Sequence, residues 1–342
     1  MQNSHILLIY TGGTIGMIQD PETGSLMPFN FSNIYEQIPV LNQFSCKIDS
    51  ISFEPVIDSS NVDAKFWKKL AHTIKNNYEK YDGFVILHGT DTMAFTASAL
   101  SFMLEDLYKP VILTGSQLPI GTLRTDGMEN LVTSIEIASA KENGKALVPE
   151  VCICFESKLY RGNRTTKNNS EHFSAYKSNN YPILAEAGIH IKFNTKAIHY
   201  PEHQKILRIY DTFCDNVAIL KIFPNINKNT ISAIINTPKL KGLIIETYGS
   251  GNAPTDDWFI KEVQQAIEKQ IIVVNITQCS TGGVDMGRYE TSLKLKQIGV
   301  VSGQDMTTEA AITKLMLLLG QNLRYDEVKM YMQNSLAGEI TN

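Results

Sequence analysis

Short apolar runs alternate with segments of helical periodicity along the first half of the chain. The apolar runs predict strands at residues 5–10, 83–88, 110–115 and 151–155. Helical patterns predict helices at residues 66–78, 93–104 and 127–141. Strands separated by helices are typical of βαβ units, so we predict a parallel sheet that is flanked by helices.

The alternation stops at residues 189–215, which are polar and have no sustained period. We interpret residues 191–215 as a linker with room for short strands. The pattern then resumes, with strands predicted at 217–222, 242–246 and 271–276 and helices at 258–269 and 308–319. We therefore predict an α/β protein of two domains, a larger one at residues 1–190 and a smaller one at residues 216–342.

Composition narrows the class of protein. The 342 residues are 43% hydrophobic, which is enough for two domains with their own cores. Charged residues make up 19%, the net charge is −4 and no basic run occurs, so neither nucleic acid nor an anionic membrane is an expected partner. Residues 1–4 lead into a strand pattern without a signal peptide, and no apolar run approaches the roughly 18 residues of a membrane span. We expect a cytoplasmic protein.

Cysteine and histidine spacing argues against a disulfide framework or a metal centre. The five cysteines are an odd number and include no Cys-x-x-Cys pair. Cys152 and Cys154 fall within a predicted strand, where we expect buried free thiols. The seven histidines form no His-x-x-x-His pair, so we predict no metal.

The first predicted strand is followed by the glycine-rich sequence Thr11-Gly12-Gly13-Thr14-Ile15-Gly16. Its spacing differs from that of dinucleotide-binding and P-loop motifs, and the turn-rich residues 19–24 cannot open a phosphate-binding helix. Gly12 and Gly13 would allow a ligand to approach the backbone, beside a displayed Thr14 hydroxyl. A tight turn with an incidental threonine is the alternative.

The second cluster, His88-Gly89-Thr90-Asp91-Thr92, follows the strand at 83–88. Because ligands bind at the carboxyl ends of parallel strands, these hydroxyls and this carboxylate are candidates for a site. A threonine hydroxyl needs a neighbouring base or cation to react near neutral pH. Alternatively, Asp91 or Thr92 is a helix N-cap. We expect His88 to be a packed strand residue rather than a catalyst.

These two clusters resemble the two signatures of bacterial L-asparaginases, and the likeness is greatest to the cytoplasmic, type I subgroup. Further segments agree with that family in the same order along nearly the whole chain. They are Asp58-Ser59-Ser60, Thr114-Gly115-Ser116-Gln117, residues 160–167, residues 248–254, residues 275–279 and Asp305-Met306-Thr307.

The resemblance implies a flavodoxin-like parallel sheet in the larger domain, and hydrolysis of L-asparagine to L-aspartate and ammonia without metal or organic cofactor. It implies that Thr14 is the nucleophile that forms an acyl-enzyme, and that Thr90 is a second catalytic threonine paired with Lys167. A buried lysine there would be deprotonated or act as a proton relay, because desolvation lowers the pKa of a lysine. Asp91 would bind the substrate amino group.

The loop of Asp58, Ser59 and Ser60 would bind the α-carboxylate and amino group of the substrate. The family also shares its site across a dimer, often paired into a tetramer, so the resemblance implies that Asn252 reaches the substrate of a neighbouring subunit. The alternative for residues 248–254 is a plain Gly-Pro loop.

The chain departs from the family at two places. The family has a tyrosine about ten residues after the nucleophile, whereas residues 17–28 contain none and Ser25 or Leu26 stands in that region. Some members also have a second, activating asparagine pocket. Its positions here are Thr166, Glu246, Thr247, Tyr248 and Cys279, where Glu246 replaces an arginine and would repel a carboxylate.

Two other functions stay open on the sequence. The same fold occurs in a subunit of a tRNA-dependent amidotransferase, which supplies ammonia to a partner and carries an extra N-terminal domain. We expect that version less, because the nucleophile motif starts within fifteen residues of Met1. The second of these other functions is that of a nucleotide-binding or regulatory module, which only the glycine-rich loop favours. The preference for asparagine or glutamine is not fixed, because one methylene is worth only about 1–3 kcal/mol.

Overall fold

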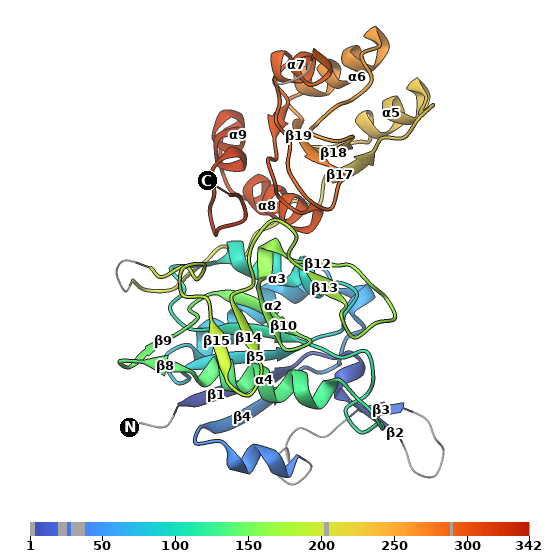
Figure 1. Ribbon diagram of the computed structural model, residues 1–342. Helices are drawn as coiled ribbons and strands as arrows, with labels where there is room; N and C mark the ends of the chain where they lie inside the picture. Colours follow the sequence, from blue (N-terminus) through green and yellow to red (C-terminus); the bar gives the residue numbers. More distant parts are fainter. Residues whose placement is uncertain (1–3, 20–25, 29–37, 202–204, 288–289, 342) are drawn as a thin grey trace. The chain divides into compact units, whose positions relative to one another are not determined.

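The computed structural model describes residues 4–19, 26–28, 38–201, 205–287 and 290–341. The chain divides into two compact units, Met1–Tyr210 and Asp211–Asn342 (Figure 1). Residues 191–210, which we expected to be part of a linker, therefore fall within the first unit. No helix within the described residues is long and apolar enough to cross a membrane.

The first unit is built on an eight-stranded sheet, in the order β15-β14-β11-β10-β7-β5-β1-β4. Five of these strands are parallel to one another: β1 (His5–Tyr10), β4 (Lys47–Ser52), β5 (Gly83–Leu87), β7 (Val111–Thr114) and β10 (Val151–Phe155). Their spatial order, β4-β1-β5-β7-β10, is the flavodoxin-like order. The predicted parallel sheet is confirmed for this part.

The remaining strands of this sheet differ from a purely parallel prediction. They are β11 (Lys158–Arg161), β14 (Ala185–Ala187) and β15 (Ile191–Phe193), and each pairs antiparallel with its neighbour. A short hairpin after β11, formed by β12 (Thr166–Lys167) and β13 (Tyr176–Lys177), lies outside the sheet. The other short pairs are β2 (Met17–Gln19) with β3 (Leu26–Pro28), β8 (Lys141–Glu142) with β9 (Lys145–Ala146), and β6 (Leu104–Glu105) with β16 (Arg208–Ile209).

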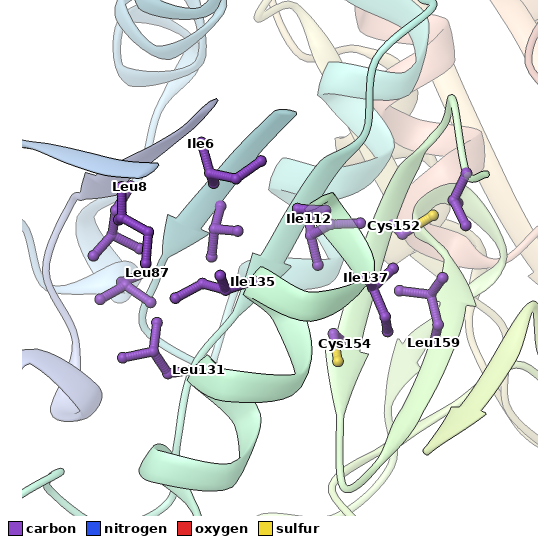
Figure 2. Close-up of a cluster of buried hydrophobic side chains, with 14 of the residues drawn as sticks. Ile6, Leu8, Leu87, Ile112, Leu131, Ile135, Ile137, Cys152, Cys154 and Leu159 are labelled. Carbon is purple, nitrogen blue, oxygen red and sulfur yellow. The ribbon is translucent and has the colours of Figure 1, made fainter. Parts of the chain in front are cut away.

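Three helices cover the parallel strands, α2 (Ala64–Asn77), α3 (Met93–Met103) and α4 (Gly127–Ser139). The view of Figure 1 places α2 and α3 on the opposite side of the sheet from α4. Figure 2 shows Leu131 and Ile135 of α4 beside the strand residues Leu8 and Leu87. Both faces of the central strands are buried, which explains why their sequences are continuous apolar runs.

The second unit is a smaller sheet of four parallel strands in chain order: β17 (Val217–Lys221), β18 (Gly242–Thr247), β19 (Ile272–Thr277) and β20 (Val301–Ser302). Its helices are α5 (Lys228–Ile235), α6 (Asp257–Glu268), α7 (Glu290–Gln297), α8 (Thr308–Gly320) and α9 (Tyr325–Gln333). Leu243 and Val273 share a core cluster with Phe259 of α6. Gly242 lies against Leu315 of α8, because a side chain at Gly242 would meet it.

All five cysteines are free thiols, as expected. Figure 2 places Cys152 and Cys154 of β10 in the core, and burial raises the pKa of Cys154 to about 12. Both thiols therefore stay protonated at neutral pH and pack as small apolar groups.

Candidate active site

The two threonine clusters lie at the carboxyl ends of neighbouring central strands. The first follows β1 and the second follows β5, and Tyr10 of β1 is in register with Leu87 of β5. The amide and the hydroxyl of Thr11 both donate to the Leu87 carbonyl, at 3.0 Å and 2.8 Å. From β1 the chain goes to β4 on one side and then to β5 on the other, so this is the point where the strand order reverses and where α/β sheets bind ligands.

Glycines bring three loops into contact at this point. A side chain at Gly12 would come within 2.1 Å of the Ile57 carbonyl oxygen, and one at Gly13 within 2.5 Å of the Gly89 backbone. A side chain at Gly89 would come within 2.6 Å of Ser59 Oγ. We expected these glycines to admit a ligand; instead, neighbouring protein loops occupy the space that the missing side chains leave.

Thr14 opens a single 3₁₀ turn, Thr14–Gly16, directly after these glycines. The Tyr10 hydroxyl donates to the Gly16 carbonyl at 3.0 Å, and a side chain at Gly16 would clash with the Tyr10 ring. Burial raises the pKa of Tyr10 to about 12, so its hydroxyl remains a donor at neutral pH. Of the two residues in the region of the family's tyrosine, Ser25 lies outside the described residues and Leu26 begins β3.

The second turn is fixed by a buried chain of hydrogen bonds. Trp67 Nε1 donates to Thr96 Oγ1 at 3.1 Å, and Thr96 Oγ1 lies 3.0 Å from His88 Nε2. His88 Nδ1 lies 2.7 Å from the Gly89 carbonyl, which only accepts, so Nδ1 carries the proton. Burial lowers the pKa of His88 to about 4, so the ring is neutral at pH 7. The expectation that His88 is packed is confirmed, although it directly follows β5 and does not belong to the strand. Trp67 and Thr96 are supports that the sequence analysis missed.

Lys167 contacts both polar residues at the tip of the second turn. Its Nζ atom is 2.9 Å from Thr90 Oγ1 and 2.7 Å from Asp91 Oδ1. The Lys167 side chain is 19% exposed and that of Asp91 is 66% exposed. A lysine, a threonine hydroxyl and a carboxylate thus form one connected group that is open to solvent on the side of Asp91.

The N-cap alternative for the second cluster is confirmed for the position of Thr92 but not for a capping hydrogen bond. Thr92 holds the N-cap position of α3, but its side chain makes no capping hydrogen bond. Its hydroxyl instead donates to the Ser59 carbonyl at 2.7 Å. Thr92 therefore ties the second turn to the loop that contains Asp58 and Ser60.

That third loop is a 3₁₀ turn, Ser59–Asn61, with Asp58 at its N-cap. Asp58 Oδ1 accepts from the Ser60 amide at 2.9 Å and from the Ser60 hydroxyl at 2.8 Å. These hydrogen bonds lower the pKa of Asp58, so the carboxylate is charged at neutral pH. Asp58 and Ser60 are exposed while Ser59 is buried, so two of the three candidate side chains face solvent.

The candidate residue Asn252 lies in a tight turn after β18 in the second unit. Tyr248 and Asn252 exchange two backbone hydrogen bonds, of 2.9 Å and 2.8 Å. Asn275 of β19 supports the turn, since its Nδ2 atom donates to the Gly251 carbonyl at 3.2 Å. Thr247 is fully buried and donates to Asn275 Oδ1 at 2.7 Å, so it belongs to the framework of this turn.

The candidates for a second pocket fall in both units. Thr166 belongs to β12 of the first unit, whereas Glu246 and Cys279 belong to the second. The Glu246 carboxylate accepts from the Thr308 hydroxyl at 2.7 Å and lies 3.4 Å from Lys221 Nζ. Cys279 is exposed. Glu246 therefore stands at the position of the family's arginine, and its carboxylate already contacts Thr308 and Lys221 of its own unit.

The described residues contain no group of side chains with the composition of a metal-binding site. Among the residues that the structure describes, no three His, Cys, Asp or Glu side chains are grouped so that they could hold a metal ion.

Comparison with known proteins places the whole chain in one family. Residues 5–199 match the family model described as Asparaginase, N-terminal, and residues 216–332 match the Glutaminase/Asparaginase C-terminal domain. L-asparaginase 1 of Escherichia coli K12 is 42% identical over 346 positions, which cover 100% of this chain and 99% of that protein.

Solved structures agree with the sequence comparison. L-asparaginase I of Vibrio cholerae is 40% identical, with a TM-score of 0.88 over 99% of this chain and 100% of that one. The thermostable L-asparaginase of Thermococcus kodakarensis is 31% identical, with a TM-score of 0.89 over 99% of each chain. The family models and these structures thus define a two-domain amidohydrolase. The chain belongs to the asparaginase family.

Proposed function

We propose that the protein hydrolyses L-asparagine to L-aspartate and ammonia through an acyl-enzyme on Thr14. The observation that carries the proposal is the contact of Lys167 Nζ with Thr90 Oγ1, at 2.9 Å, and with Asp91 Oδ1, at 2.7 Å. The turn that contains Thr90 and Asp91 packs against the turn of Thr14. Two hydroxyls on adjoining turns, of which one is paired with a lysine, suit a nucleophile and a proton relay.

In the first half of the reaction, Thr14 Oγ1 attacks the side-chain amide carbon of asparagine. The oxyanion that forms is stabilised by backbone N–H groups of the two turns. The C–N bond then breaks, and ammonia leaves with the proton that Thr14 gave up. This half leaves an aspartyl ester on Thr14.

In the second half, water adds to the ester and the bond to Thr14 breaks. Thr90 and Lys167 take the proton from water and return it to Thr14 Oγ1, which releases aspartate and restores the enzyme. Proton transfer by positioned side chains contributes about 10²–10⁴-fold in enzymes. The reaction balances without metal, nucleotide or redox partner.

Substrate recognition needs an anion for the α-ammonium group and donors for the α-carboxylate. Asp91 and Asp58 lie on two turns that the hydrogen bond from Thr92 to Ser59 connects, and both carboxylates are exposed. Ser59 and Ser60 provide the hydroxyls of the adjoining loop. We propose that Asp91 binds the α-ammonium group of the substrate. The loop of Asp58, Ser59 and Ser60 binds both its α-carboxylate and its α-ammonium group.

We further propose that the enzyme assembles as a homodimer or homotetramer in which Asn252 completes the site of a neighbouring subunit. The exposed tip of its turn, at Gly249, supports this role. Light scattering gives the mass of the assembly. Mixing inactive Thr14→Ala subunits with inactive Asn252→Ala subunits should restore activity if sites are shared, and should restore none if each subunit is complete alone.

Kinetics can test whether the chain has the second, activating asparagine pocket. A carboxylate at Glu246 would oppose the α-carboxylate of a bound effector, so we expect a hyperbolic dependence of rate on asparagine concentration. A sigmoidal dependence that Glu246→Gln alters would instead support an effector pocket in this region.

The decisive assay is ammonia release from asparagine and from glutamine, side by side, with a chelator present. We expect turnover of asparagine by the purified protein without added metal or nucleotide. A thermal-shift series provides the opposing test: stabilisation by ATP or NAD, with none by aspartate and no ammonia release, would favour a nucleotide-binding module and overturn the proposal.

A further inference from the structure

A tyrosine next to Lys167 holds the same threonine as Lys167 does. In the β12–β13 hairpin, Lys167 is in register with Tyr176 on the antiparallel strand. Directly opposed residues of an antiparallel pair project from the same face, so both side chains extend in the same direction from the hairpin.

Both side chains donate hydrogen bonds to Thr90. Lys167 Nζ donates to the Thr90 hydroxyl at 2.9 Å, and the Tyr176 hydroxyl donates to the Thr90 carbonyl oxygen. Thr90 is thus held at its side chain by Lys167 and at its backbone by Tyr176, and these two residues face each other across the hairpin.

The tyrosine is itself fixed to the sheet. Its side chain is 1% exposed, and its ring meets Phe155, the last residue of β10, at a centroid distance of 5.0 Å and an angle of 60°. A buried tyrosine hydroxyl requires a partner, and here that partner is the carbonyl of a proposed catalytic residue. Through Tyr176, the position of Thr90 is therefore fixed relative to β10 as well as to β5, the strand that it follows.

We propose that Tyr176 is a positioning residue for the amidohydrolase reaction. Its hydroxyl fixes the Thr90 backbone so that Thr90 Oγ1 points at Lys167 Nζ during proton relay. This inference rests on the proposed function. Without the hydroxyl, the part-buried Thr90 carbonyl would lose this donor, and the Thr90 peptide would rotate away from the relay geometry.

The test is Tyr176→Phe, which removes the hydroxyl and keeps the ring against Phe155. The matched control is Tyr181→Phe, since the Tyr181 hydroxyl also donates to a backbone carbonyl, that of Ala197, at 2.8 Å in the same unit. We expect kcat for asparagine to fall about three- to tenfold in Tyr176→Phe, equivalent to about 0.6–1.4 kcal/mol. KM should change less than twofold, and Tyr181→Phe should keep the wild-type kcat.

A kcat within twofold of wild type in Tyr176→Phe would overturn the inference. So would an equal loss in both variants, because that would indicate general loosening of the unit. Hydrogen exchange of the peptide containing residues 88–92 provides a readout that needs no activity: it should speed up in Tyr176→Phe and not in Tyr181→Phe. If wild-type protein releases no ammonia while this exchange difference appears, the proposed function fails and the positioning contact stands.

Discussion

The two threonine turns lie side by side, yet they are held in different ways. Among the described residues, the turn of Thr14 packs through its backbone, with Gly13 against Gly89, and Tyr10 donates a hydrogen bond to its Gly16 carbonyl. The turn of Thr90 is held by side chains from several elements, including Lys167 and Tyr176. The proposed function divides the work between the two turns, so that the Thr14 hydroxyl attacks and Thr90, which side chains hold, relays protons.

The largest expected effect is that of Thr14→Ala. Removing a nucleophile from a covalent mechanism should lower kcat by at least about a thousandfold. Thr14→Ser, which keeps a hydroxyl, should retain measurable turnover. Circular dichroism and thermal unfolding should be unchanged in both. Near-normal ammonia release by Thr14→Ala would show that the first turn does not carry the nucleophile.

Lys167→Met tests the second turn next. The substitution keeps much of the side-chain volume and removes the donor to Thr90 and the charge beside Asp91. We expect kcat to fall by about 10²–10⁴-fold, the usual share of proton transfer. Lys177→Met is the control, because Lys177 lies on the paired strand of the same hairpin and is exposed. Equal losses in both variants would argue against a relay through Lys167.

Gly13→Ala tests whether the contact between the turns is tight. Both Gly13, at φ 86°, and Gly144, at φ 78°, are strained for alanine, but only Gly13 has backbone atoms within 2.5 Å of the new Cβ. Gly144→Ala should cost about 1–2 kcal/mol of unfolding free energy, and Gly13→Ala about 1–3 kcal/mol more, with loss of activity. Urea unfolding measures both. Equal costs would mean that the turns can separate without penalty.

The smallest effect concerns pH and His88. Its pKa of about 4 lies below the ordinary value of 6.5, so the unfolded chain binds the proton first as pH falls. The stability due to neutral His88 is complete above pH 6.5 and is lost as pH falls toward 4, by up to about 3 kcal/mol. Urea unfolding at several pH values should show a steeper loss in wild type than in His88→Gln. Parallel curves would contradict a neutral, buried ring.

Much of the fold could be predicted because the central strands are buried on both faces. Runs such as residues 6–9 and 83–87 have no polar position and so stand out in the sequence. The strand β4 (KIDSIS) is largely polar and was missed, and the antiparallel strands β14 and β15 are only three residues long. Short strands at a sheet edge leave little periodicity to detect.

The two threonine turns of the site could also be predicted, because they follow these apolar strands. Local motifs marked Thr14 and Thr90, because each follows an apolar strand directly. Lys167 was placed only by family resemblance, and Tyr176 was not foreseen, since its partner lies 86 residues away in the sequence. Contacts of that kind depend on the tertiary arrangement of the hairpin and leave no local signal.

The most direct test of the division of work between the two turns is to trap the covalent intermediate. The enzyme is mixed with asparagine, quenched in acid at early times and analysed by peptide mass spectrometry. We predict an aspartyl ester on the peptide that contains Thr14, and none on the peptide that contains Thr90. An ester on Thr90, or steady turnover with no ester on either threonine in wild type and Lys167→Met, would contradict the account.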